Sequence, residues 1–208
     1  MNLKIITRIS VALFIATLSG CEWDFPLSNP TDAFKEPQLT GPWKLVTSYA
    51  YSSETEFTKS TPAKGELSIL TIMNAAAAKV EDPDDPTYPE NIFIVGFVEF
   101  HKPLRPGRSP GSKTTQFAWA TKIGDVTYLN IGSAKEDTPR GDEKDRGYSV
   151  VKYVLDGDRL VMYTLNRVAR NRINSFLGDF YSAEVLKKQL TQGKSTDWQP
   201  ALEFTRMK

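Results

Sequence analysis

The chain has almost none of the residues on which most catalytic and metal sites depend. It contains one cysteine, Cys21, and one histidine, His101, among 208 residues. A lone cysteine excludes an intramolecular disulfide and leaves a zinc site short of ligands. No motif supplies a nucleophile and an orienting acid for the histidine. We therefore predict a protein that is not an enzyme, with no catalytic residues, no metal and no cofactor.

A strong net charge is also missing. The 26 basic and 25 acidic residues give a formal charge of +1. Because nucleic-acid-binding domains usually carry a large basic excess, nucleic acid is not an expected partner. A hydrophobic content of 40% with 25% charged residues is typical of a globular protein.

Only one apolar run stands apart, and it is too short for a permanent membrane span. Lys4 and Arg8 precede an apolar run over residues 9–18. This order of charge and apolar residues predicts a secretory signal peptide over residues 1–20. A buried N-terminal helix of the folded domain is the alternative interpretation.

The run ends in Leu18-Ser19-Gly20-Cys21, which resembles the lipobox of bacterial lipoproteins. The resemblance implies lipidation of Cys21 with diacylglycerol, cleavage before it, and acylation of the new amino terminus. Several acyl chains make a stable anchor, because each buried CH₂ contributes about 0.8 kcal/mol. Glu22 follows, where such proteins use aspartate for inner-membrane retention. The implied location is the bacterial envelope, on the outer membrane facing the periplasm in a Gram-negative host.

Residues 21–40 predict a lipidated cysteine followed by a flexible tether. They contain Pro26, Pro30 and Pro37 and show no sustained hydrophobic period, which is typical of a spacer. The folded domain is therefore expected over residues 41–208.

The hydrophobic pattern of that domain is typical of a β-protein. Alternating or continuous apolar residues predict strands over 43–51, 65–73, 91–100, 116–123, 126–131, 148–155, 159–165 and 202–204. Gly124-Asp125 and Asp156-Gly157 predict tight hairpin turns. We expect a mainly β fold, a single antiparallel up-and-down barrel of about eight strands with one C-terminal helix before the last strand.

Helix signals appear only late in the chain. Ser182 as a cap, Glu184 in the first turn and Gly193 as a left-handed terminator predict that helix. Residues 166–177 show helical spacing but leave the choice between helix and loop open.

Gly41-Pro42-Trp43 resembles the Gly-x-Trp opening of lipocalin-like barrels, and a helix before the last strand is similar to their ending. The resemblance covers about residues 39–206, although the Thr-Asp-Tyr motif of that group is absent. It implies a basic residue that follows the last barrel strand and covers the tryptophan. Arg167, which follows the predicted strand over residues 159–165, is the candidate for this role by its position.

Two sets of side chains are candidate contact sites. Arginines after a predicted strand could receive an anionic head group, or cover aromatic rings with their stems: Arg167, Arg170 and Arg172. Aromatic residues could line a cavity for an apolar ligand, or fill a packed core: Phe93, Phe97, Phe117, Trp119, Tyr128 and Tyr153.

Two charged loops are expected to be solvated. Residues 81–85 are acidic but lack the order of an EF-hand. Residues 102–113 are basic and could contact phosphates of lipids or of an envelope polymer.

Two functions stay open. The first is a binding module that carries or senses a small apolar or amphipathic ligand within the barrel. The second is a packed-core protein that inhibits or scaffolds another envelope protein. In both, the lipid on Cys21 would join the protein to the membrane.

Overall fold

The computed structural model describes residues 22–23, 26–52, 56–63, 66–76, 92–100, 113–132, 147–177 and 182–208. The predicted leader, Cys21, the acidic residues 81–85, His101 and residues 102–112 of the basic loop lie outside the described residues.

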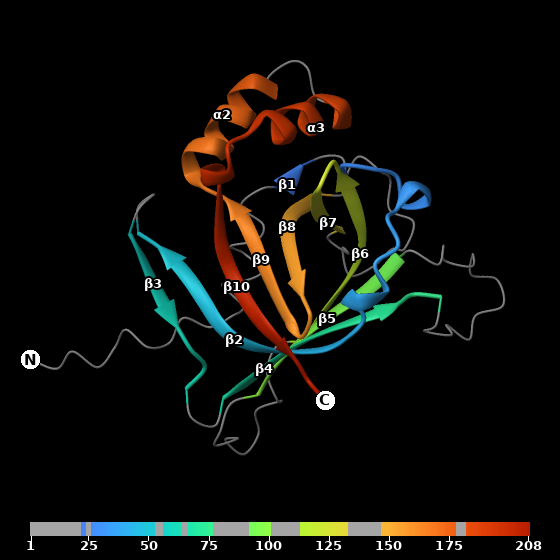
Figure 1. Cartoon of the computed structure of the whole chain (residues 1–208), viewed down its shortest axis with the longest axis vertical. Helices are drawn as coiled ribbons and strands as arrows, with labels where there is room; N and C mark the ends of the chain where they lie inside the picture. The colour runs from blue at the N-terminus through green and yellow to red at the C-terminus, as the bar shows by residue number, and fades with distance from the viewer. Residues whose placement is uncertain are drawn as a thin grey trace, which may run out of the picture.

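Eight antiparallel strands form a closed ring (Figure 1). Apart from one short hairpin strand, neighbours in the ring follow one another along the chain, and the last strand pairs with the first. The predicted mainly β, up-and-down barrel is confirmed. The ring consists of β2 (Gly41–Tyr51), β4 (Leu67–Asn74), β5 (Ile92–Phe100), β6 (Lys113–Ile123), β7 (Val126–Gly132), β8 (Tyr148–Asp156), β9 (Arg159–Leu165) and β10 (Trp198–Arg206).

Two short strands extend the ring. β1 (Glu22–Trp23) pairs with the first two residues of β8, whereas β9 pairs with its last five. β3 (Phe57–Ser60) pairs with the second half of β2, whereas β4 pairs with the first half. β2 and β3 therefore form a ribbon that leaves the ring on one side (Figure 1).

Glycine forms both predicted hairpin turns. Gly124 and Gly157 have φ values of 59° and 56°, and no described non-glycine residue has a positive φ. Positive φ at the first central residue only is the pattern of a type II′ turn. In the second hairpin Asp156 pairs with Arg159, so the loop is Gly157-Asp158, one residue later than predicted.

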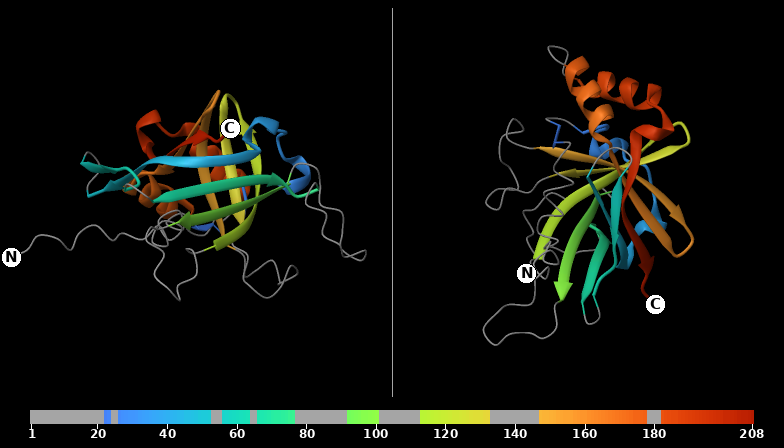
Figure 2. Two further views of the ribbon diagram at one scale, coloured as in Figure 1. Left: turned by 90° about the horizontal axis from the view of Figure 1, so that it is seen from below. Right: turned by 90° about the vertical axis from the view of Figure 1, so that its left-hand side faces the viewer.

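Two helices lie between β9 and β10, on one side of the barrel (Figure 2). The predicted helix is α3 (Ala183–Gln192), where the Ser182 hydroxyl accepts a hydrogen bond from the Val185 N–H. Gly193 has a φ of −66° and so ends α3 without the left-handed conformation expected of it. The undecided segment forms α2 (Arg167–Leu177), whose start is capped because the Asn166 side chain accepts the Ala169 N–H.

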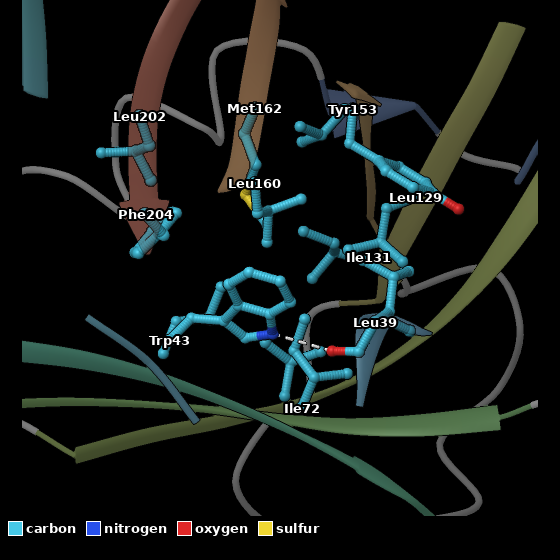
Figure 3. Packing of buried hydrophobic residues seen from close by; sticks show 14 of the residues in the cluster. Leu39, Trp43, Ile72, Leu129, Ile131, Tyr153, Leu160, Met162, Leu202 and Phe204 are labelled. Atoms are coloured by element: carbon cyan, nitrogen blue, oxygen red, sulfur yellow. Dashed lines mark hydrogen bonds between the residues drawn. The ribbon is translucent and has the colours of Figure 1, made fainter. Parts of the chain in front are cut away.

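The barrel interior holds one buried cluster, called here the inner cluster (Figure 3). Each strand of the ring contributes at least two inward side chains, as the two-residue period of a strand requires. Its members are Leu39, Trp43, Leu45, Leu70, Ile72, Phe93, Val95, Phe97, Ala118, Ala120, Leu129, Ile131, Val151, Tyr153, Leu160, Met162, Leu202 and Phe204.

A second buried cluster, the outer cluster, lies between the barrel wall and the helices. Outward-facing residues of β7, β8 and β9 meet the apolar faces of α2 and α3 and two residues from the start of the described chain. Its members are Trp23, Leu27, Tyr128, Val150, Leu165, Ala169, Ile173, Leu186 and Leu190.

Residues 26–40, predicted to form a flexible tether, pack against the barrel instead. Leu27 and Leu39 are fully buried. The Leu27 N–H donates to Asn130 Oδ1 at 2.8 Å, and the Phe34 N–H donates to the Ala120 carbonyl at 2.8 Å. Two of the prolines that indicated a tether begin short 3₁₀ turns, η2 (Pro30–Asp32) and η3 (Pro37–Leu39).

Candidate interaction surfaces

The six aromatic residues predicted to line one cavity lie on both sides of the barrel wall. Phe93, Phe97 and Tyr153 point inward and belong to the inner cluster. On β6 the inward positions are taken by Ala118 and Ala120, so the alternate residues face outward. The residues on the outside are Phe117, Trp119 and Tyr128. A single aromatic cavity built from all six is therefore excluded.

The protein's own side chains occupy the barrel interior. Trp43, Tyr153 and Phe204 are among its largest fully buried members. The Tyr153 hydroxyl is buried there without a hydrogen-bond partner among the described residues, and burial raises the pKa of Tyr153.

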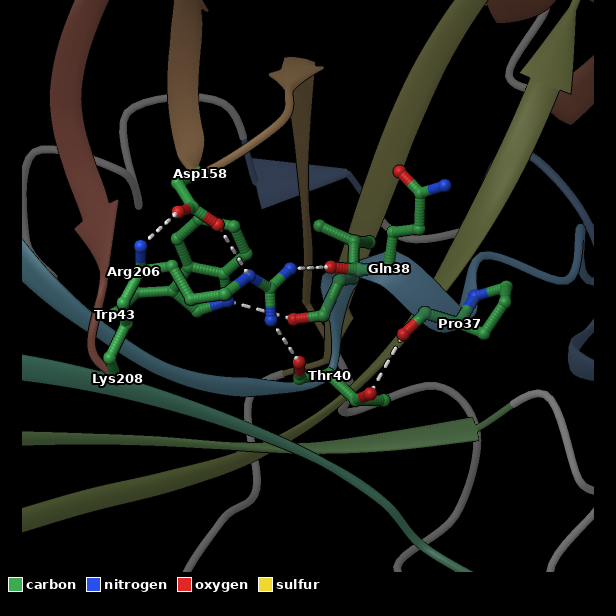
Figure 4. A network of polar contacts seen from close by, with 8 residues as sticks. Pro37, Gln38, Thr40, Trp43, Asp158, Arg206 and Lys208 are labelled. Carbon is green, nitrogen blue, oxygen red and sulfur yellow. Dashed lines mark hydrogen bonds and ion pairs between the residues drawn. The ribbon is translucent and has the colours of Figure 1, made fainter.

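A polar network around Trp43 joins the start of β2 to the end of β10 (Figure 4). The indole N–H donates to the Leu39 carbonyl at 2.8 Å. The Arg206 guanidinium covers the ring and donates to the carbonyls of Thr40, at 2.8 Å, and of Gln38.

Arg206, not Arg167, is thus the basic residue that covers the tryptophan. Arg167 begins α2 and is exposed. Arg167 follows β9, but β10 is the strand that closes the ring, and Arg206 is its last residue.

The structure does not bring the three candidate arginines together on one face of α2. With about 100° between successive residues of a helix, Arg172 lies about 140° around α2 from Arg167. Arg172 Nη2 lies 2.6 Å from Asp197 Oδ2 and thereby ties α2 to η5 (Ser195–Asp197). Burial alone would raise the pKa of Asp197, but hydrogen bonds from Arg172 and the Lys194 N–H hold it below its usual value. Arg170, which lies between Arg167 and Arg172 in the sequence, is half-buried.

An aromatic surface that sequence reasoning missed lies on the β2–β3 ribbon. We define the aromatic ribbon as Tyr49, Tyr51, Phe57 and Lys59. Tyr51 pairs with Phe57 and Tyr49 with Lys59, so all four side chains share one face. The Phe57 ring centre lies 5.6 Å from that of Tyr51 and 5.8 Å from that of Tyr49.

Contacts with β10 fix the orientation of this face. The Tyr51 hydroxyl donates to the Pro200 carbonyl at 2.9 Å, and the Tyr49 hydroxyl donates to Glu203 Oε2 at 3.3 Å. Burial and the Glu203 carboxylate raise the pKa of Tyr49. Phe57, held between the two tyrosines, is still 48% exposed. Only the alternation Tyr49-x-Tyr51 and Phe57-x-Lys59 across a short loop could have indicated this face.

The outer edge of β3 has backbone groups that no described strand pairs with. The Ser52 N–H donates to the Glu56 carbonyl at 3.1 Å, which places Glu56, Thr58 and Ser60 in the hydrogen-bonded pairs with β2. The N–H and C=O groups of Phe57 and Lys59 consequently point away from β2. Within the described ranges no strand pairs with that edge.

The surface also has an open cleft of about 390 Å³ between the β6–β7 turn and the end of α3. The rings of Tyr128 and Trp198, 5.6 Å apart, form its aromatic wall, and Lys152 and Lys194 also line it. Burial raises the pKa of Tyr128 to about 12. None of the described residues that line the cleft is acidic.

Comparisons with known proteins give no match. No protein family, no curated protein and no solved structure is significantly similar to the chain. Among the helices described, none is long and apolar enough to cross a membrane. In the same part of the chain, no three His, Cys, Asp or Glu side chains are grouped so as to hold a metal ion.

Proposed function

We propose that the protein is a lipid-anchored bacterial envelope lipoprotein whose barrel is an interaction module, located on the outer membrane and facing the periplasm in a Gram-negative host. The free edge of β3 would hold an extended segment of another envelope protein. The observation that carries this proposal is the aromatic ribbon with its unpaired edge. The large side chains buried inside the barrel, Trp43, Tyr153 and Phe204 among them, support it, because they turn attention to the outer surface as the place for contacts.

The edge suits recognition by strand addition. A partner strand beside β3 would receive hydrogen bonds from two N–H groups and donate to two carbonyls, those of Phe57 and Lys59. Each bond contributes about 0.5–1.5 kcal/mol net. In this mode of binding the backbone supplies affinity and alternate side chains supply specificity. Here the alternate side chains of the partner would meet Phe57 and the Lys59 ammonium, which favours an apolar residue and an acidic one.

A backbone substitution tests strand addition. Lys59→Pro removes an N–H that points away from β2, so the β2–β3 pairing is retained, whereas Lys59→Ala removes the same side chain and keeps the N–H. A photoreactive phenylalanine analogue at Phe57 should cross-link one envelope protein in living cells. The product should persist with Lys59→Ala and fall at least tenfold with Lys59→Pro.

Two results would contradict the proposal. One is equal cross-linking in the alanine and proline variants, which would exclude backbone pairing. The other is the same product from the analogue placed at Met73, which is 45% exposed on β4 and lies outside the ribbon.

The anchor has its own test. Cys21→Ala should abolish incorporation of labelled palmitate and leave the leader uncleaved, because acylation needs the thiol. Glu22→Asp should keep the label but move the protein toward the inner-membrane fraction. Palmitate incorporation that survives Cys21→Ala would exclude the proposed anchor.

The cleft favours a second candidate function, the binding of a small amphipathic anion such as a fatty acid. Its aromatic wall suits an apolar chain, and Lys152 and Lys194 suit a carboxylate. Laurate should perturb the fluorescence of the protein, and Lys194→Gln should weaken its affinity about fivefold or more. Lys44→Gln, at an exposed position of β2, is the matched control. Equal affinity in both variants would exclude the cleft.

A further inference from the structure

We infer that the barrel sits directly on the bilayer, with the side formed by β1 and α2 against the phospholipid head groups, and that no spacer separates it from its anchor. The inference rests on the proposed lipidation of Cys21 and goes beyond it, because it states which surface contacts the membrane.

The chain between anchor and barrel has no slack. Glu22 is paired with Ser149 of β8, and the Cα of Cys21 can lie only about 3.8 Å from that of Glu22. A flexible spacer of about twenty residues, as the sequence indicated, would instead have a root-mean-square span of roughly 25 Å. The difference decides whether the domain turns freely above the membrane or keeps one side toward it.

Packing keeps Glu22 in place. Trp23, the next residue, pairs with Tyr148 and is only 1% exposed within the outer cluster. Burial of large apolar side chains stabilises a docked segment, and Leu27 adds a second fully buried side chain four residues later. β1 can therefore leave β8 only if Trp23 leaves the outer cluster, which keeps Glu22 beside Ser149.

The surface nearest to the anchor suits head groups. Trp23 shares the outer cluster with Ala169 and Ile173, which places α2 beside β1. Of the three arginines of α2, Arg170 is half-buried and Arg172 pairs with Asp197, so Arg167 presents the exposed charge. At its start Arg167 is exposed and Val168 is 50% exposed. A cation is attracted to an anionic leaflet, and apolar side chains can enter the interface.

The opposite end of β8 provides the reference point. Asp156 lies eight residues beyond Tyr148, about 26 Å away along the strand. The turn after it carries Asp158, which lies 3.7 Å from Arg206 Nε and 3.7 Å from Lys208 Nζ. The same strand thus has one end at the anchor and the other end far from it.

Two single-cysteine variants test the orientation. Because Cys21 is the chain's only cysteine and its thiol would be consumed by lipid, an introduced cysteine is the one free thiol. The acylated protein is reconstituted in vesicles of phosphatidylethanolamine and phosphatidylglycerol that contain a head-group quencher. A fluorophore on Val168→Cys should be quenched at least threefold more than one on Asp158→Cys. Equal quenching would overturn the inference.

A variant with a longer connection between anchor and barrel supplies the control. Ten glycine and serine residues inserted between Cys21 and Glu22 add a span of roughly 17 Å and leave every contact of the domain unchanged. The difference in quenching should shrink toward equality at unchanged acylation. If it persists, anchor length does not set the orientation and the inference fails. A wild-type protein without acyl mass on Cys21 would instead refute the proposed anchor itself.

Discussion

Arg206 stacks on Trp43, with the guanidinium carbon 4.1 Å from the ring centre. The pair joins the last strand of the ring to the first, and the same guanidinium donates to two carbonyls just before β2. One side chain therefore links β10, the indole ring and the backbone of residues 38–40.

Replacement of Arg206 should destabilise the barrel strongly. Arg206→Ala loses two charge-assisted hydrogen bonds and a cation–π contact, and its side chain is only 25% exposed. We expect a loss of about 3 kcal/mol in the free energy of unfolding, measured by urea denaturation. Arg206→Lys should recover less than half, because an ammonium cannot reproduce the planar fork. Arg159→Ala, which removes an exposed ion pair, is the control and should stay close to wild type.

Asn130 should control the docking of the segment before the barrel. This fully buried side chain accepts the Leu27 N–H and donates to the Trp119 carbonyl and to Thr121 Oγ1. Asn130→Ala leaves the Leu27 N–H without an acceptor, which costs about 2 kcal/mol. Hydrogen exchange at residues 26–34 should accelerate in this variant. Thr121→Ser, which keeps the hydroxyl, should exchange as wild type does, and unchanged exchange in Asn130→Ala would contradict the docking role.

The Arg172–Asp197 pair should make the free energy of unfolding depend on pH in the acid range. The pKa of Asp197 is lower in the folded protein than in the unfolded chain. Its contribution is therefore complete above the unfolded value, about 3.9, and is lost as the pH falls through the lower folded value. Asp197→Asn and Arg172→Gln should both flatten the loss of stability below pH 4. A profile as steep as that of wild type would place the acid sensitivity elsewhere.

Removal of the Tyr153 hydroxyl should not harm the protein. The group is buried without a hydrogen-bond partner among the described residues, so Tyr153→Phe removes a desolvation cost. We expect an unchanged or higher urea midpoint, with a gain of up to about 1 kcal/mol. Tyr51→Phe is the matched control and should lose about 0.5–1 kcal/mol, because its hydroxyl donates to Pro200. A comparable loss in Tyr153→Phe would reveal a partner for that hydroxyl.

The eight strands of the ring could be predicted because each presents apolar side chains at every second residue or in a continuous run. The two hairpin turns could be predicted because Gly124 and Gly157 can adopt the positive φ values that such turns need. β3 could not be predicted, since all four of its residues are exposed and therefore show no hydrophobic pattern. Trp23, Leu27 and Leu39 dock one at a time from an irregular segment, which has no period to detect.

The candidate sites were less predictable than the fold. Whether Phe117 or Ala118 faces the interior depends on the phase of β6, and both phases carry apolar residues. The choice between Arg167 and Arg206 depended on which strand closes the ring. That closure is a long-range pairing which no local pattern encodes.

The contact between β2 and β10 determines the order in which the domain can assemble. Arg206 bonds the carbonyl of Thr40, 166 residues earlier in the chain. The β6–β7 and β8–β9 hairpins need only local contacts and can form early, whereas ring closure must overcome the entropy of bringing distant segments together. During synthesis the barrel therefore stays an open, edge-exposed sheet until residues 198–206 emerge. In this interval a chaperone that shields strand edges would have most effect on yield.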